Sequence, residues 1–95
     1  MTLVGRNPEA SPGSTALAIA DSTRTISRTH AAFMVLDGTL FVEDRDSANG
    51  TLVERSGVVS ECPRGGRLAL DDGDVVLIGE VRLVVMRGGA EEGNR

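Results

Sequence analysis

The sequence predicts an all-β domain, a sandwich or barrel of many short strands. Two hairpin signals indicate this: Asp-Gly at 37–38 in "AAFMVLDGTLFVED" and Gly-Glu at 79–80 in "DVVLIGEVRLVVM" each separate two apolar runs. Asp-Gly fits a type I′ turn and Gly-X a type II′ turn, whose twist suits a hairpin. Residues 81–86 also place apolar side chains on alternate positions, which is the period of a strand.

The other elements follow in chain order. Two prolines and a glycine in "RNPEASPGS" (6–14) predict a loop. The alanines of "STALAIADS" (14–22) favour helix, but the segment is too short for an isolated helix, so we expect it to be extended. "DDGD" (71–74) is a turn cluster, and residues 55–64 show no pattern that predicts an element. Shorter strands are expected at Thr2–Arg6, Thr51–Glu54 and Arg67–Leu70.

Length and composition exclude several functional classes. The chain of 95 residues is sized for one domain, which we expect at residues 1–87, followed by a disordered tail at 88–95. A net charge of −4 argues against nucleic acid as a partner. The single Cys62 cannot form an internal disulfide, and no apolar run approaches the roughly 18 residues of a membrane span. We therefore expect a cytoplasmic domain with no nucleic-acid or membrane partner.

The segment "TISRTHAAF" (25–33) places Ser27 three residues before His30. A serine hydrolase is an unfavourable interpretation, because residues i and i+3 of a strand face opposite sides and no glycine-flanked nucleophile turn surrounds Ser27. "DRDSANGTLVE" is not a calcium loop either, since Asn49 and Arg55 stand where that loop requires glycine and glutamate. We expect no enzyme activity, no metal and no cofactor.

Four motifs taken together resemble the forkhead-associated (FHA) domain, a phosphothreonine-binding β-sandwich. They are "GR" at 5–6, "SRTH" at 27–30, "SANGT" at 47–51 and "LALDDGDVVLIG" at 68–79. The resemblance runs from about Leu3 to Val85 and implies two twisted, mostly antiparallel sheets. Only four residues precede Gly5, where the family usually has an additional strand. The resemblance therefore implies a sandwich that lacks this usual first strand or closes differently.

The resemblance also implies ligand-binding roles. Arg6 would bind the phosphate through its guanidinium, and Ser27 would donate its hydroxyl to a second phosphate oxygen. Arg28 would add contacts to the phosphate or the peptide, and Asn49 would hold the peptide backbone, because an amide both donates and accepts.

Three further residues would shape the loops. His30 would bond across them, while Gly5 and Gly50 would permit the turns that bring them together. Two positions depart from the family: Ala48 stands where many members carry a polar residue, and Thr25 supplies no second basic group two residues before Ser27.

Two functions remain open from the sequence. The first is a phosphothreonine-dependent module of Ser/Thr kinase signalling, whose partner is a kinase or its substrate. The second is an FHA-like scaffold that docks a protein without phosphate. Arg6 and Ser27 favour the first function, with Arg24 and Arg28 adding positive charge near the same loops, whereas Ala48 favours the second.

Overall fold

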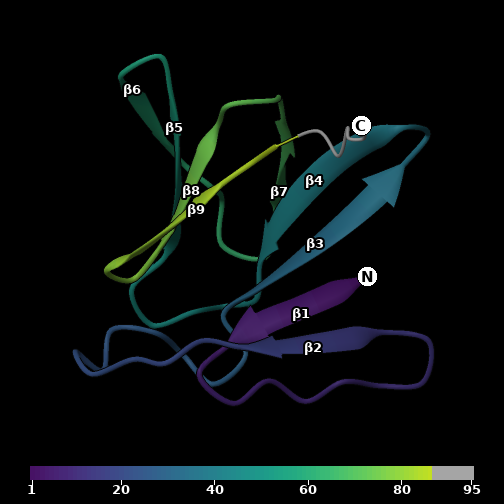
Figure 1. Ribbon diagram of the computed structural model, residues 1–95, viewed down its shortest axis with the longest axis vertical. Helices are drawn as coiled ribbons and strands as arrows, with labels where there is room; N and C mark the ends of the chain where they lie inside the picture. The colour runs from purple at the N-terminus through teal and green to yellow at the C-terminus, as the bar shows by residue number, and fades with distance from the viewer. Residues whose placement is uncertain (87–95) are drawn as a thin grey trace, which may run out of the picture.

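The structure, a computed structural model, describes residues 1–86 and consists of two packed β-sheets (Figure 1). One sheet has the strand order β2-β1-β3-β4-β7 and the other β6-β5-β8-β9. All pairs are antiparallel except β1 with β2. The strands are β1 (Thr2–Gly5), β2 (Thr15–Ala18), β3 (Ala31–Leu36), β4 (Thr39–Asp44), β5 (Thr51–Arg55), β6 (Val58–Glu61), β7 (Arg67–Leu70), β8 (Val75–Ile78) and β9 (Val81–Val84). This two-sheet sandwich confirms the predicted fold class.

Both predicted hairpins are confirmed. Asp37 and Gly38 have φ angles of +51° and +78°, the pair of positive values that a type I′ turn requires. Gly79 has φ +59° at the first position of the β8–β9 turn, as in a type II′ turn. The extended conformation expected within residues 14–22 is confirmed by β2, although all four of its residues are exposed.

One strand is absent from the sequence prediction. β6 lies within residues 55–64, where no pattern indicates an element, and it pairs with β5 through a two-residue turn. The turn residues Ser56 and Gly57 have φ angles of +51° and +82°, the same signs as in the first hairpin. The dipeptide Ser-Gly between two apolar runs is the signal that indicates this turn.

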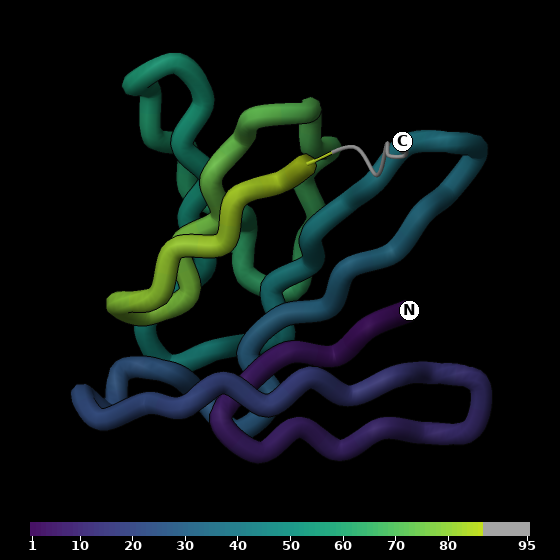
Figure 2. The backbone as a smooth tube through the Cα atoms, in the orientation of Figure 1, coloured from purple at the N-terminus to yellow at the C-terminus, as the bar shows by residue number. Residues whose placement is uncertain are grey.

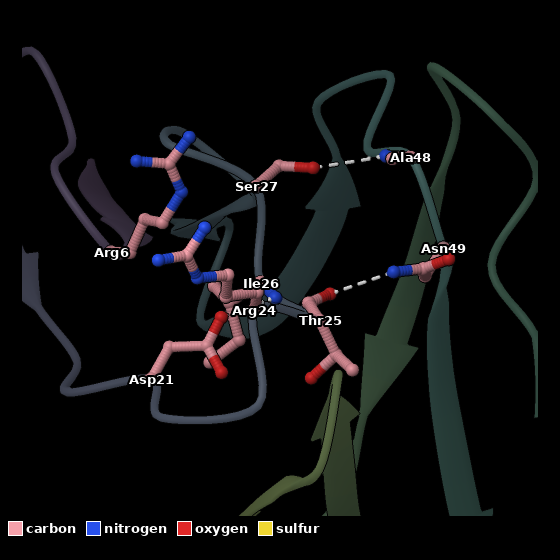
Figure 3. Close-up of a pocket in the computed structure, with 8 residues that line it drawn as sticks. All are labelled: Arg6, Asp21, Arg24, Thr25, Ile26, Ser27, Ala48 and Asn49. Atoms are coloured by element: carbon pink, nitrogen blue, oxygen red, sulfur yellow. Dashed lines mark hydrogen bonds between the residues drawn. The ribbon is translucent and has the colours of Figure 1, made fainter.

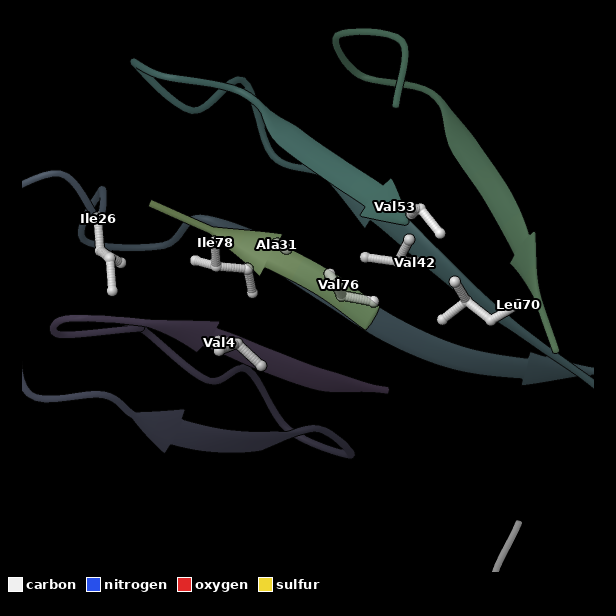
Figure 4. Close-up of a cluster of buried hydrophobic side chains, with 8 residues drawn as sticks. All are labelled: Val4, Ile26, Ala31, Val42, Val53, Leu70, Val76 and Ile78. Carbon is white, nitrogen blue, oxygen red and sulfur yellow. The ribbon is translucent and has the colours of Figure 1, made fainter. Parts of the chain in front are cut away.

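The core lies between the sheets (Figure 4). Val4 and Val42 come from one sheet and Val76 and Ile78 from the other, each 1 % exposed or less. Ile26 joins them from the segment between β2 and β3, so burial of this side chain fixes an irregular loop to the sandwich. The cluster comprises Val4, Ile26, Ala31, Val42, Val53, Leu70, Val76 and Ile78.

No helix within residues 1–86 is long and apolar enough to cross a bilayer. The predicted tail at 88–95 lies outside the described residues, so the boundary at residue 87 stays a prediction.

A charge-assisted contact joins β5 to the turn between β7 and β8. Asp74, 2 % exposed, accepts hydrogen bonds from Arg55 Nε at 2.9 Å and Nη2 at 2.7 Å, and from the Asp71 N–H at 2.8 Å. The Arg55 hydrogen bonds lower the pKa of Asp74 below its ordinary value, with burial opposing them and the Asp71 N–H adding to the lowering. The ionised form of Asp74 is therefore the one that the fold stabilises.

This contact predicts an acid-sensitive stability. Because the pKa of Asp74 is lower in the folded than in the unfolded chain, its contribution is full above the ordinary value of about 4 and is lost as pH falls through the folded pKa. Between about pH 7 and about pH 3, the urea midpoint of Asp74→Asn should fall less than that of the wild type. Asp37→Asn, at an exposed turn, is the matched control and should fall as the wild type does. Equal losses in the wild type and Asp74→Asn would contradict the prediction.

Candidate functional site

Three loops and one turn meet at one end of the sandwich. The segment after β1, the segment between β2 and β3 and the loop between β4 and β5 lie together, with the β8–β9 turn beside them (Figure 2). Hydrogen bonds join them: Arg6 N to Ser27 O at 3.1 Å, Ala48 N to Ser27 Oγ at 2.9 Å and Glu80 N to Thr25 Oγ1 at 3.1 Å. Residues distant in the chain therefore form one surface.

His30 connects two of these loops from below. Its ring is fully buried, Nδ1 accepts a hydrogen bond from the Ser27 N–H at 3.0 Å, and Nε2 lies 2.8 Å from the Gly50 carbonyl. A carbonyl only accepts, so the ring proton is assigned to Nε2 and the imidazole is neutral in this arrangement. The contacts are those that a loop-holding role requires, and the role itself stays a prediction.

Asp44 organises the loop between β4 and β5. Its Oδ1 accepts hydrogen bonds from Ser47 Oγ at 2.5 Å and Thr51 Oγ1 at 2.8 Å, and all three residues are buried. Burial raises the pKa of Asp44, but the hydrogen bonds from Ser47 and Thr51 outweigh it, so the net shift is downward. Gly50 completes the turn with φ +83° and donates its N–H to Ser47 Oγ at 3.0 Å. Sequence reasoning missed this buried network, although Asp and Ser beside an Asn-Gly turn are its signal.

Gly5 lies at the end of a strand, where it allows two backbones to approach closely. Its φ is not in the positive range, and it is the last residue of β1. A Cβ built on Gly5 would lie 2.8 Å from the Ser27 carbonyl oxygen and closer still to that of Arg28. Glycine is therefore required by the close approach of two backbones, which brings Arg6 beside Ser27.

These loops line an open pocket of about 570 Å³ (Figure 3). It brings together three of the four residues predicted to bind ligand: Arg6, Ser27 and Asn49. Arg28 lies instead in an adjacent hollow of about 240 Å³ with Asn7, Glu9 and Thr29. The pocket is lined by Arg6, Asp21, Arg24, Thr25, Ile26, Ser27, Ala48 and Asn49.

Two polar side chains in the pocket keep a hydrogen-bonding function for a ligand. Ser27 Oγ accepts from the Ala48 N–H, which leaves its own O–H able to donate. Asn49 Nδ2 donates to the Thr25 carbonyl at 3.0 Å, which leaves Oδ1 able to accept. The pocket thus presents a hydroxyl donor beside an amide acceptor.

The arginines of the site differ from those elsewhere in the described chain. Five arginines outside the site each have a carboxylate within 4.0 Å: Arg45, Arg55, Arg64, Arg67 and Arg82. Within residues 1–86, no carboxylate forms such an ion pair with Arg6, Arg24 or Arg28. Uncompensated positive charge is therefore concentrated at this end of an acidic chain. This positive charge suits an anionic ligand.

Asp21 is the one carboxylate that lines the pocket. Its Oδ2 accepts from the Ile26 N–H at 2.7 Å, and Oδ1 accepts from the Thr23 N–H at 3.2 Å and hydroxyl at 2.8 Å. Burial raises the pKa of Asp21, but these hydrogen bonds lower it by more. Asp21 therefore shapes the loop with both oxygens and forms no ion pair with a pocket arginine. In the part of the chain that the structure describes, no group of three or more His, Cys, Asp or Glu side chains is placed to hold a metal ion.

Comparison with known proteins matches the chain to one family. The model of the FHA domain matches residues 2–79. Proteins named oxoglutarate dehydrogenase inhibitor are similar to the chain: that of Corynebacterium glutamicum is 37 % identical over 90 residues and that of Corynebacterium diphtheriae 39 % identical over 87 residues. The matches cover 95 % and 92 % of this chain but 53 % and 51 % of the relatives. The chain thus spans about half the length of these relatives.

The contacts of His30 predict separate effects on stability. His30→Ala leaves the half-buried Ser27 N–H and Gly50 carbonyl without their partner, and we expect it to lower the free energy of unfolding by about 2–4 kcal/mol. Ser27→Ala removes only the acceptor of the exposed Ala48 N–H, so its cost should be about 0.5–1.5 kcal/mol. Urea denaturation of both variants measures the difference. An unchanged midpoint for His30→Ala would refute its loop-holding role.

Proposed function

Because the chain belongs to the FHA domain family, we propose that it is a phosphothreonine-dependent peptide-binding module of Ser/Thr kinase signalling. The observation that supports this most is uncompensated arginine charge in a pocket that also presents the Ser27 hydroxyl and the Asn49 amide. Its partner is then a protein phosphorylated on threonine, such as a kinase or a kinase substrate.

The proposed binding mode assigns one chemical task to each group. A phosphothreonine carries about −1.5 to −2 charges near neutral pH, and the Arg6 guanidinium binds two of its oxygens in a fork. The Ser27 O–H donates to another phosphate oxygen. Asn49 Oδ1 accepts an N–H of the peptide backbone next to the phosphothreonine. Arg28, in the adjacent hollow, binds the peptide rather than the phosphate.

The comparisons indicate a regulatory binding protein rather than a catalyst, since the domain family and the relatives named as inhibitors share that character. The geometry at Ser27 agrees with this. His30 Nδ1 accepts the backbone N–H of Ser27 and Nε2 contacts Gly50, so neither ring nitrogen is placed to take the hydroxyl proton.

The phosphate dependence of binding is the first test of the proposal. A suitable phosphothreonine peptide should bind with a Kd on the order of micromolar, and its unphosphorylated form far more weakly. Arg6→Ala should weaken binding by about 1.5–3 kcal/mol, the range for a hydrogen bond to a charged group. Isothermal calorimetry with both peptides decides the matter. Equal affinity for the two would overturn the proposal in favour of phosphate-independent docking.

The choice of phosphothreonine over phosphoserine is a second test. Both residues offer the same phosphate to Arg6 and Ser27, so only the γ-methyl group distinguishes them. We expect this methyl to contact the turn at 49–50, where its burial contributes about 0.8 kcal/mol by transfer and restricts the side-chain rotamer. Matched peptides should therefore differ by at least several-fold in Kd. Equal binding would mean that the turn at 49–50 provides no pocket for the methyl.

A further inference from the structure

We propose that Arg24 is a second phosphate-binding cation of this site, and that with Arg6 it selects ligands carrying two negative charges on one phosphoryl group. The inference rests on the proposed function and extends it to a residue outside the motifs. Arg24 lines the same pocket as Arg6 and Ser27, and Figure 3 shows both guanidinium groups extending into it.

The residues on either side of Arg24 are fixed in place. Thr23 is held by Asp21 Oδ1 through both its N–H and its hydroxyl, and its hydroxyl also contacts Thr25 Oγ1 at 2.8 Å. The carbonyl of Thr25 accepts from Asn49 Nδ2, and its hydroxyl accepts from the Glu80 N–H. These five hydrogen bonds involve residues from three parts of the chain and hold the segment around Arg24, which presents its side chain at the pocket.

The backbone of Arg24 is in the left-handed region, with φ +59°. This conformation favours glycine, and an arginine in it is strained. The other non-glycine residues with a positive φ in the described chain are two aspartates and a serine, all of which lie between strands. An arginine at this position thus has a conformational cost, and within residues 1–86 no ion pair or hydrogen bond of its side chain offsets it.

The charges around Arg24 indicate which ligand would offset the conformational cost of its positive φ. Arg6 approaches from the end of β1 and repels it. Asp21, on the same loop, has both carboxylate oxygens committed to Thr23 and Ile26 and forms no ion pair with Arg24. An anion between the two guanidinium groups removes their repulsion, and a doubly charged one does so best.

Peptides that differ only in the charge of one group test this selectivity. Phosphothreonine is largely a dianion at neutral pH, whereas O-sulfothreonine has the same tetrahedral shape and a single negative charge. Arg24→Gln should weaken binding of a phosphothreonine peptide about tenfold and that of the sulfothreonine peptide less than about threefold. Arg67→Gln, which removes the same charge from the distant strand β7, should change both by less than about twofold. Equal losses for the two peptides, or none for either, would overturn the inference.

A second variant separates binding from folding. Arg24→Gly removes the guanidinium and suits φ +59°, so it should raise the thermal midpoint while it weakens phosphothreonine binding about as much as Arg24→Gln does. Unchanged binding by Arg24→Gly would refute the role of Arg24 and leave the proposed function standing. A wild-type protein that binds phosphorylated and unphosphorylated peptides equally would refute the proposed function itself.

Discussion

Two hydrogen bonds of one buried imidazole join the loops on which the candidate site is built. His30 accepts from the Ser27 N–H with one nitrogen and donates to the Gly50 carbonyl with the other, so two loops 20 or more residues apart in the chain share a single rigid ring. The backbone of His30 continues this connection, because its N–H donates to the Val4 carbonyl at 2.8 Å and its carbonyl accepts from the Arg45 N–H at 2.9 Å. A planar ring buried among fixed partners has little freedom to move. We therefore expect the pocket above it to be formed before a ligand binds, which would reduce the entropy lost on binding.

Charge is distributed unevenly over this small domain, and the distribution has a cost. Outside the site, the arginines of the described chain pair with carboxylates, as Arg64 does with Asp46 at 2.9 Å. Inside it, Arg6 and Arg24 line one pocket without such partners. Like charges that face each other destabilise the protein, and the phosphate that we propose as ligand would reverse the sign of that interaction. On the proposed function, this end of the domain would lose some stability and gain affinity, while pairs such as Arg55 with Asp74 stabilise the fold elsewhere.

The parts of the fold that sequence predicts are those set by local chemistry. The turns at 37–38 and 79–80 follow from residue types that tolerate positive φ, and the short strands follow from alternation. β6 was missed because Ser56 is a weaker turn signal than Asp or Asn. The close approach between β1 and residues 27–28, which requires the glycine at position 5, is a tertiary contact that φ preferences do not encode. Arg24 could be assigned only a general positive charge, since its place in the pocket depends on anchors from Asn49 and Glu80, far along the chain.

The hydrogen bond from Glu80 to Thr25 bears on the order in which the pocket forms during synthesis. Glu80 donates to Thr25 across 55 residues of sequence, and Gly79 passes so near Thr25 and Ile26 that a Cβ there would lie 2.9 Å from Ile26 Cγ1. The loop around Thr25 is synthesised early, but the turn that supports it is one of the last elements of the domain. A nascent chain emerging from the ribosome therefore exposes Arg6 and Ser27 well before it can hold them in place, and closing so long a loop is entropically costly. Competence to bind should arise in a single late step, when the β8–β9 hairpin docks.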